Sequence, residues 1–221
     1  RIGAMTREVE LEDSELIQSN YPILLDTAKM IADPQVRNLA TLGGNLAHGD
    51  PANDHPATML ALRAQVEITG QGGKRTVPID DFFPDFFTTV LEHGEILTEI
   101  QIPIPPSNSG GTYLKIERKV GDYAVAAVAA QVSLGADGTF QQVGLGLTNV
   151  GPVPIRAVRS EDSLRGQRPD EALYAQAGQL ASEDADPGDD LRGSADYKRS
   201  LIRELIKRAL RRAVDHAQGR S

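Results

Sequence analysis

Cysteine is absent from this chain of 221 residues. Without thiolate side chains, the chain can build no disulfide, no cysteine-ligated metal site and no iron–sulfur cluster. It also has no apolar run of the length that spans a membrane, no Gly-x-Gly-x-x-Gly fingerprint and no P-loop lysine motif. These absences exclude metal chemistry on cysteine and the two best-known nucleotide-binding motifs.

The chain also has fewer basic than acidic residues, 23 Lys and Arg against 31 Asp and Glu. The formal net charge is −8 and the isoelectric point is near 5.0, which argues against a nucleic-acid-binding surface. The four histidines have no metal-ligand spacing, and no hydrolytic or nucleophilic residue set converges. Hydrophobic content of 40% and charged content of 24% are ordinary for a globular protein. Any redox or group-transfer chemistry must therefore come from a bound cofactor that the protein positions.

Residues 33–54 are rich in residues that serve backbone geometry and polar presentation rather than core volume. Gly43 and Gly44 can adopt positive φ and leave no Cβ in the way of a ligand, so successive N–H groups can form an anion nest. Thr41 and Asn45 flank the pair with short hydrogen-bonding side chains, and a second polar loop carries Asp50, Asn53 and Asp54. The alternative is that Gly-Gly-Asn is an ordinary turn.

The first half of the chain predicts helices followed by strands. Residues 6–31 are expected to be helical, with Ser14 as a cap and Pro22 in the first turn of a second piece, ending at Asp33-Pro34. Asp54 is a candidate N-cap for the next helix. Strands are expected around residues 66–68 and 77–79, with a turn at 70–73. Four clustered phenylalanines in residues 82–87 favour core packing or a partner contact over stacking on a ligand.

The second half predicts an antiparallel sheet followed by helices. Prolines and small residues at 103–111 mark the expected domain boundary, and strands are expected at 112–118, 126–134 and 140–148. Residues 136–138 signal a hairpin, and Gly144, Gly146 and Thr148 on one strand face predict close approach by another element. Helices are expected at 172–180 and near 201–214, separated by an acidic loop at 182–190. The basic face of the last helix favours solvent or a subunit contact over nucleic acid.

Three blocks of the sequence resemble one family. The blocks are residues 31–54, the run Lys119-Val120-Gly121-Asp122-Tyr123-Ala124 and residues 146–150. They resemble the FAD-binding medium subunits of molybdenum hydroxylases, most closely those of aerobic carbon monoxide dehydrogenases. The resemblance implies an α+β fold. Residues 1–105 would form the second lobe of an FAD-binding domain of the vanillyl-alcohol-oxidase type, with a mixed sheet and helices. Residues 106–221 would form the flavoprotein C-terminal domain, an antiparallel sheet with helices.

The same resemblance implies an FAD site, with the pyrophosphate on residues 41–45. Tyr123 would lie over the isoalloxazine ring and gate or tune it, although a packed strand tyrosine is the common alternative. Lys115 would place a charge near the flavin carbonyls, or else be a solvated strand lysine. Leu97, an apolar residue on a mostly polar strand face, would contact the flavin. The full set implied is Ile31, Ala32, Thr41, Leu42, Gly43, Gly44, Asn45, Asp50, Asp54, Leu97, Lys115 and Tyr123, with no metal ligand.

The function implied is an electron-transfer subunit. A large molybdopterin subunit would pass electrons to the iron–sulfur clusters of a small subunit. The FAD of this chain would take electrons from those clusters and pass them to quinone, NAD or oxygen. A dimer of heterotrimers is expected, in the cytoplasm or at the inner face of the membrane. The alternatives are a stand-alone flavin oxidoreductase and an assembly module without flavin. Since Arg1-Ile2-Gly3-Ala4 resembles the end of a smaller first lobe, we expect that lobe to be missing and FAD binding by these residues alone to be weak.

Overall fold

The chain folds into two four-stranded antiparallel sheets with helices around them. The computed structural model describes residues 1–220, so the last residue of the expected C-terminal domain lies outside it. The first sheet has the order β1-β4-β2-β3 and the second the order β5-β6-β7-β8. The α+β class is confirmed, but every pairing in the first sheet is antiparallel rather than mixed. The strands are β1 (Ile2–Gly3), β2 (Gln65–Gly70), β3 (Gly73–Pro78), β4 (Ile96–Gln101), β5 (Ser109–Ile116), β6 (Ala126–Leu134), β7 (Phe140–Thr148) and β8 (Ile155–Arg156).

Six α-helices precede the first long strand, and their ends follow local sequence signals. The Ser14 hydroxyl accepts a hydrogen bond from the Ile17 N–H, and Pro22 occupies a first turn, as predicted. Helix α3 ends at Met30, before Asp33-Pro34 as predicted, and Asp33 then caps a further short helix. The helices are α1 (Glu8–Asp13), α2 (Glu15–Asn20), α3 (Pro22–Met30), α4 (Pro34–Arg37), α5 (Leu42–Ala47) and α6 (His55–Ala61), and a 3-10 turn, η1 (Ile79–Asp81), follows β3.

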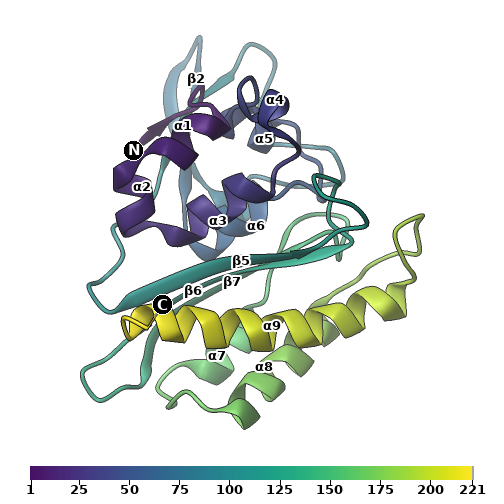
Figure 1. Cartoon of the computed structure of the whole chain (residues 1–221). Coiled ribbons are helices and arrows are strands. Elements are labelled where there is room, and N and C mark those ends of the chain that lie inside the picture. The colour runs from purple at the N-terminus through teal and green to yellow at the C-terminus, as the bar shows by residue number, and fades with distance from the viewer. Residues whose placement is uncertain (221) are drawn as a thin grey trace.

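The second sheet lies between two layers of helices (Figure 1). Helices α3 and α6 pack on one face. On the other face, α9 (Ala195–Ala217) covers β5 and β6, α7 (Val158–Leu164) contacts β7, and α8 (Glu171–Asp184) packs against both of these helices. Each face has its own buried apolar core. The predicted apolar stripe of the last helix is buried against the sheet, whereas α8 extends four residues further than the sequence indicated, into the expected acidic loop.

The close approach expected at the glycines of β7 is confirmed. A Cβ at Gly144 would collide with the carbonyl oxygen of Ala61, and one at Gly146 with that of Ala57. Both carbonyls belong to α6, so the backbone of this helix packs directly on strand β7. This contact fixes α6, and therefore the polar loop before it, against the second sheet. The hairpin between β6 and β7 is also as predicted, with Gly138 at φ +79°.

Candidate functional site

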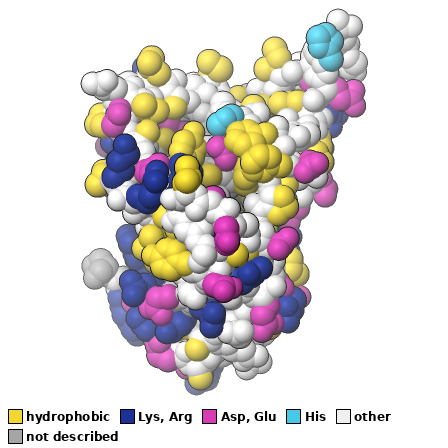
Figure 2. All heavy atoms as spheres, turned by 90° about the vertical axis from the view of Figure 1, so that its right-hand side faces the viewer, with side chains coloured by type: hydrophobic (Ala, Val, Ile, Leu, Met, Phe, Trp, Pro, Cys, Tyr) yellow, Lys and Arg dark blue, Asp and Glu magenta, His cyan; other side chains and the backbone are white. Residues whose placement is uncertain are grey.

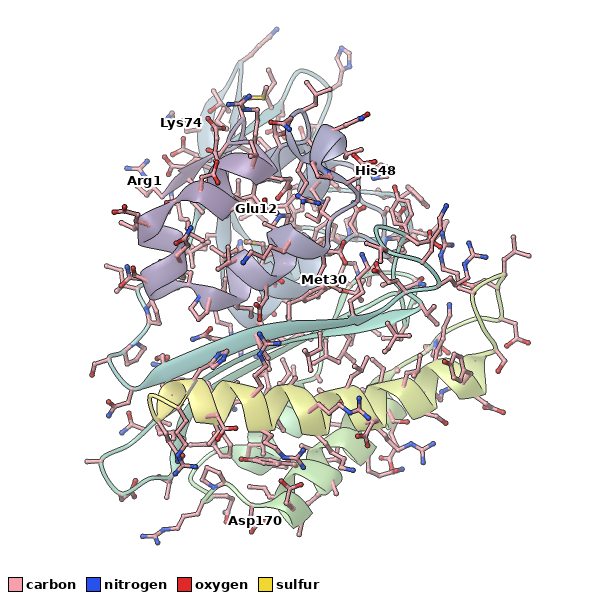
Figure 3. The ribbon with its side chains drawn as sticks, viewed as in Figure 1. Arg1, Glu12, Met30, His48, Lys74 and Asp170 are labelled. Atoms are coloured by element: carbon pink, nitrogen blue, oxygen red, sulfur yellow. The ribbon has the colours of Figure 1, made fainter. Side chains whose placement is uncertain are left out.

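A pocket of about 550 Å³ opens where the two parts of the chain meet. Its walls come from the segment between α3 and α5, the polar loop before α6, strand β5 and the loop at 121–123. Figure 3 shows Met30 at the end of α3 above the second sheet, with His48 on the right-hand, pocket side of the chain. Eight of the twelve predicted site residues line the pocket: Ile31, Ala32, Thr41, Gly44, Asn45, Asp54, Lys115 and Tyr123.

The Gly-Gly segment is a short capped helix and not a positive-φ nest. Neither Gly43 nor Gly44 is among the residues with positive φ, and the Thr41 hydroxyl caps α5 by accepting the Gly44 N–H at 3.1 Å. The N–H groups of Leu42 and Gly43 donate to the carbonyls of residues 6 and 4, both at 2.9 Å. Only the Gly44 N–H, whose acceptor is a hydroxyl that can rotate, is therefore available to a ligand.

The two glycines serve different purposes. A Cβ on Gly43 would lie 2.5 Å from the Ala4 Cβ and 2.7 Å from the Ala4 oxygen, so this glycine allows α5 to dock on the N-terminal segment. A Cβ on Gly44 would meet only the Thr41 Oγ1, at 2.8 Å. Gly44 therefore keeps the floor of the pocket open, whereas Gly43 and the buried Leu42 support it from behind.

An unpaired acceptor lies in the pocket wall. The side-chain oxygen of Asn45 is buried and has no hydrogen-bond partner in the part of the chain that the structure describes. The adjacent Asn53 side chain donates to the Asn45 carbonyl at 2.8 Å and lies 3.2 Å from the His48 Nδ1. Because buried acceptors are nearly always paired, the Asn45 oxygen indicates a place for a donor from a ligand.

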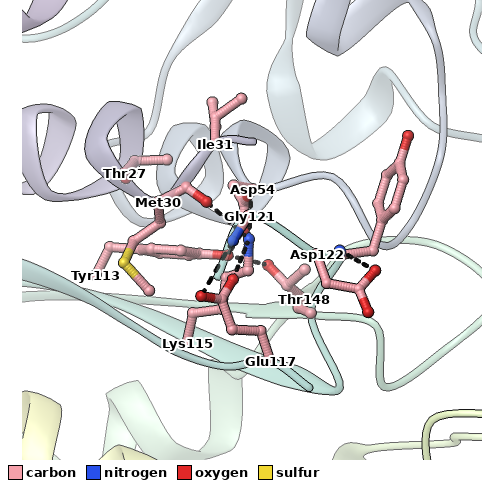
Figure 4. Close-up of polar contacts among 12 residues, drawn as sticks. Thr27, Met30, Ile31, Asp54, Tyr113, Lys115, Glu117, Gly121, Asp122 and Thr148 are labelled. Atoms are coloured by element: carbon pink, nitrogen blue, oxygen red, sulfur yellow. Dashed lines mark hydrogen bonds and ion pairs between the residues drawn. The ribbon is translucent and has the colours of Figure 1, made fainter. Parts of the chain in front are cut away.

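A buried charge cluster forms the pocket wall on the side of β5 (Figure 4). The Lys115 ammonium is 1% exposed, donates to the Met30 carbonyl at 2.9 Å, and lies 3.1 Å from the Asp54 carboxylate and 3.4 Å from that of Glu117. The solvated-lysine alternative is therefore wrong. Asp54 does not cap α6 with its side chain either, since its other oxygen accepts the Tyr113 hydroxyl at 2.6 Å.

Burial shifts the pKa values of two groups in this cluster, Asp54 and Tyr113. Desolvation raises the pKa of Asp54, although the Lys115 charge and the Tyr113 hydroxyl lower it. Burial, together with the neighbouring Asp54 carboxylate, raises the pKa of Tyr113 well above its usual value. Tyr113 is thus a neutral hydrogen-bond donor, and the pocket presents a paired carboxylate and ammonium rather than an isolated charge.

The Tyr123 loop is held against the opposite wall. Gly121 has φ +80°, and a Cβ there would lie 2.6 Å from the Ala32 oxygen, so the loop touches the end of α3. The Asp122 carboxylate accepts the Tyr123 N–H at 2.8 Å and lies 3.4 Å from an Arg192 nitrogen. The Arg192 guanidinium also lies 5.6 Å from the centre of the Tyr123 ring. Tyr123 is 44% exposed and belongs to a loop, so it is not the packed strand tyrosine of the alternative reading.

Four predicted residues do not reach the pocket. Leu42 and Gly43 lie behind it, and the Asp50 carboxylate accepts the Ala52 N–H in a local turn, at 2.8 Å. Leu97 is buried in the core of the first part of the chain, because a bulge shifts the register between Glu67 and Ile68. The bulge accounts for an apolar residue at a position that strict alternation made polar.

Sequence reasoning missed several buried polar residues around the site. Tyr113, Lys115 and Glu117 are spaced two residues apart along β5 and just beyond it. Strand periodicity could therefore have placed all three on one face. His55 is fully buried, 2.7 Å from the equally buried Glu8. No sequence pattern links these two residues. Their pair joins α1 to α6.

A second cavity, of about 400 Å³, lies between residues 103–106 and strands β6 and β7. Its arginines, Arg63 and Arg165, are paired with Glu161, and it contains none of the predicted site residues. No helix among residues 1–220 is both long and apolar enough to cross a membrane.

The fold and site define a class of flavoprotein. Residues 1–105 match the family described as FAD binding domain in molybdopterin dehydrogenase, and residues 111–213 match the CO dehydrogenase flavoprotein C-terminal domain. The chain belongs to this family: it is an FAD-binding electron-transfer subunit of the molybdenum hydroxylase type and an oxidoreductase component.

Individual relatives agree with this assignment. The chain is 41% identical to the carbon monoxide dehydrogenase medium chain of Hydrogenophaga pseudoflava, covering 96% of this chain and 74% of that one. It is 34% identical to the 6-hydroxypseudooxynicotine dehydrogenase complex subunit alpha of Paenarthrobacter nicotinovorans, covering 98% and 73%. A solved structure of the Hydrogenophaga pseudoflava carbon monoxide dehydrogenase, in a form lacking the Mo-pyranopterin moiety, superposes with a TM-score of 0.92 at 42% identity, covering 95% of this chain and 73% of that chain.

Proposed function

We propose that the pocket between α5, β5 and the Tyr123 loop is the FAD site of this subunit. The observation that carries the proposal is the convergence of an unpaired buried acceptor, Asn45, with the paired Asp54 and Lys115 and the half-exposed Tyr123 in one pocket. A ligand with both donors and acceptors, such as a ribityl chain attached to a flavin ring, suits this donor set. The pocket volume of about 550 Å³ lies within the usual range for cofactor sites.

Each wall has its own part in binding. The Gly44 N–H and the Thr41 hydroxyl would hold the phosphates, and Asn45 would accept a hydroxyl. Ile31 and Ala32 supply apolar surface, since Ile31 is buried and both line the pocket. When bound, FAD supplies the electron-accepting and electron-donating chemistry; the protein holds it, excludes water and fixes charge beside it.

Lys115 and Asp54 set the charge of the pocket wall, and Tyr123 controls access. Lys115 is held by three acceptors, so its ammonium is fixed and desolvated. A fixed positive charge stabilises negative charge that develops nearby on reduction. Tyr123 is held by a loop contact and a cation–π contact rather than by core packing, which leaves its ring free to change position.

The partners belong to the same proposal. Without cysteine, the chain relies on a small iron–sulfur subunit for electrons and on a large molybdopterin subunit for substrate oxidation. We propose carbon monoxide as the holoenzyme's substrate, quinone, NAD or oxygen as the acceptor, and a dimer of heterotrimers as the assembly. The location proposed is the cytoplasm, with the inner face of the membrane as the alternative. Residues 1–105 and 106–221 are proposed as the two domains, since each contains one sheet.

An exposed apolar surface near the pocket supports a partner on this side. Leu39 is 82% exposed, and Phe86 and Phe87 are about half exposed, with Phe87 stacked edge-on against His48 of the pocket. Figure 2 shows apolar side chains gathered on the upper part of this face and Lys and Arg side chains more abundant below. Exposed apolar groups of this kind are typical of subunit contacts.

The test is FAD retention by a pair of matched lysine variants in the full-length protein. Lys115→Met should lower the flavin bound per folded protein at least tenfold. Lys198→Met removes an equally buried lysine, 2.7 Å from Asp190 and outside the pocket, and should leave flavin content unchanged. Equal flavin content in both variants would show that FAD binds elsewhere.

A further inference from the structure

Tyr113 is a buried titratable residue to which the FAD site as proposed gives no role. It is 2% exposed, lies on β5 under the end of α3, and does not line the FAD pocket. Its hydroxyl nevertheless donates the shortest hydrogen bond of the charge cluster, 2.6 Å to the Asp54 Oδ1. A buried tyrosine hydroxyl needs a hydrogen-bond partner, and here that partner is an ionisable side chain of the FAD pocket.

The hydrogen bonds of Asp54 divide its carboxylate between two partners. Oδ1 faces the Tyr113 hydroxyl and Oδ2 faces the Lys115 ammonium, at 3.1 Å. With both oxygens engaged, the carboxylate cannot rotate, and Lys115 is kept at the pocket wall. Thr148 lies 3.4 Å from the phenol oxygen and fixes its position from the far side.

The charge balance gives this bond a specific purpose. Two carboxylates, Asp54 and Glu117, surround a single ammonium, and a buried carboxylate without a donor is costly. Tyr113 supplies the missing donor without adding charge. Removal of the hydroxyl would leave Oδ1 unpaired, and Asp54 would then turn or bind a proton, which would weaken one of the three contacts that hold Lys115.

We propose that Tyr113 is a positioning residue of the FAD site, which acts through Asp54 to hold Lys115 beside the flavin. This inference rests on the proposed function, because it requires FAD in the pocket that Asp54 and Lys115 line. It predicts that Tyr113 matters for FAD only while Asp54 can accept its hydrogen bond.

A double-mutant cycle tests this dependence in full-length protein from which FAD has been removed. The affinity for added FAD is measured for wild type, Tyr113→Phe, Asp54→Leu and the double variant. Each single change should weaken binding about tenfold, and the double variant should be no more than about twofold weaker than Asp54→Leu alone. Tyr174→Phe is the matched control: it alters a buried tyrosine of the other core and should stay within twofold of wild type.

The outcomes separate the inference from the proposed function. Wild-type affinity in Tyr113→Phe, or losses that multiply in the double variant, would overturn the role of Tyr113 while leaving the FAD site in place. Unchanged affinity in both Asp54→Leu and Lys115→Met would overturn the site itself, and the inference with it.

A second measurement leaves Tyr113 intact, in case its variant does not fold. Protein labelled with 3-fluorotyrosine gives one fluorine resonance for each tyrosine. Single Phe substitutions at the other tyrosines identify their resonances and leave that of Tyr113. FAD should shift the Tyr113 resonance in wild type and not in Asp54→Leu. The same shift in both proteins, or none in wild type, would contradict the proposal.

Discussion

Replacing each of the two adjacent glycines of α5 by alanine should separate stability from cofactor binding. For Gly43→Ala, the new methyl would meet the Ala4 Cβ at 2.5 Å and the Ala4 oxygen at 2.7 Å. Overpacking of this kind costs about 1–3 kcal/mol. If α5 moved to relieve this clash, the hydrogen bond from the Gly43 N–H to the Ala4 carbonyl would break. The loss of that bond, about 1 kcal/mol, would cancel the gain in helix propensity from alanine.

Gly44→Ala should behave in the opposite way. Its methyl meets only the Thr41 hydroxyl, which can rotate away at the loss of a cap worth about 1 kcal/mol. Alanine favours the helix over glycine by about 1 kcal/mol, so the free energy of unfolding should change little. The pocket floor is blocked, however, and a hydrogen bond to a charged phosphate is worth about 1.5–3 kcal/mol. FAD affinity should therefore fall about 10- to 100-fold.

Thermal melts and FAD titrations of the full-length protein check both halves. Gly43→Ala should lower the melting temperature by several degrees, at roughly 2–4 °C per kcal/mol for a protein of this size. Gly44→Ala should melt like wild type and bind FAD weakly. Wild-type FAD affinity in Gly44→Ala would refute the placement of the phosphates, and wild-type stability in Gly43→Ala would refute the packing argument.

Three further predictions concern other parts of the chain. Tyr123→Phe should keep FAD bound but change the rate of electron transfer from reduced flavin to the acceptor, by stopped-flow; lost FAD, or unaltered kinetics and potential, would count against gating. The hydrogen bond from Arg75 lowers the pKa of Glu95 to about 2, so the stability that Glu95 contributes over a Glu95→Gln variant should be full above about pH 4.3 and vanish as pH falls toward 2. A pH-independent difference in melting temperature would contradict this. Gly146→Ala should cost about 3 kcal/mol in chemical unfolding, because α6 rests on β7, whereas Gly72→Ala, which faces open space, should cost almost nothing; equal costs would contradict the contact.

Local signals predicted much of the fold. Proline and serine positions located helix starts, a turn signal located the β6–β7 hairpin, and small residues on one face of β7 predicted the approach of α6. Each of these depends on a few neighbouring residues or on strand alternation. The bulge in β4 breaks that alternation, so Leu97 was assigned to the wrong face.

The candidate site was predicted less completely, because its chemistry depends on residues far apart in the chain. Asp54 fits an N-cap by local rules, but Tyr113, 59 positions later, takes its carboxylate instead. Gly43 and Gly44 suggested an anion nest, but in the structure Gly43 packs against Ala4 of the N-terminal segment. The burial of Lys115 follows from the packing of α3 over β5, which no short-range pattern encodes.

Anaerobic rapid-mixing spectroscopy of the assembled complex tests the central claim most directly. On addition of the holoenzyme's substrate, the iron–sulfur absorption should bleach first and the flavin absorption second, because this chain receives electrons from a partner. The isolated flavoprotein, mixed with the same substrate, should show no flavin bleaching. Reduction of the flavin by substrate in the isolated chain, or a complex in which the flavin never reduces, would contradict an electron-transfer role.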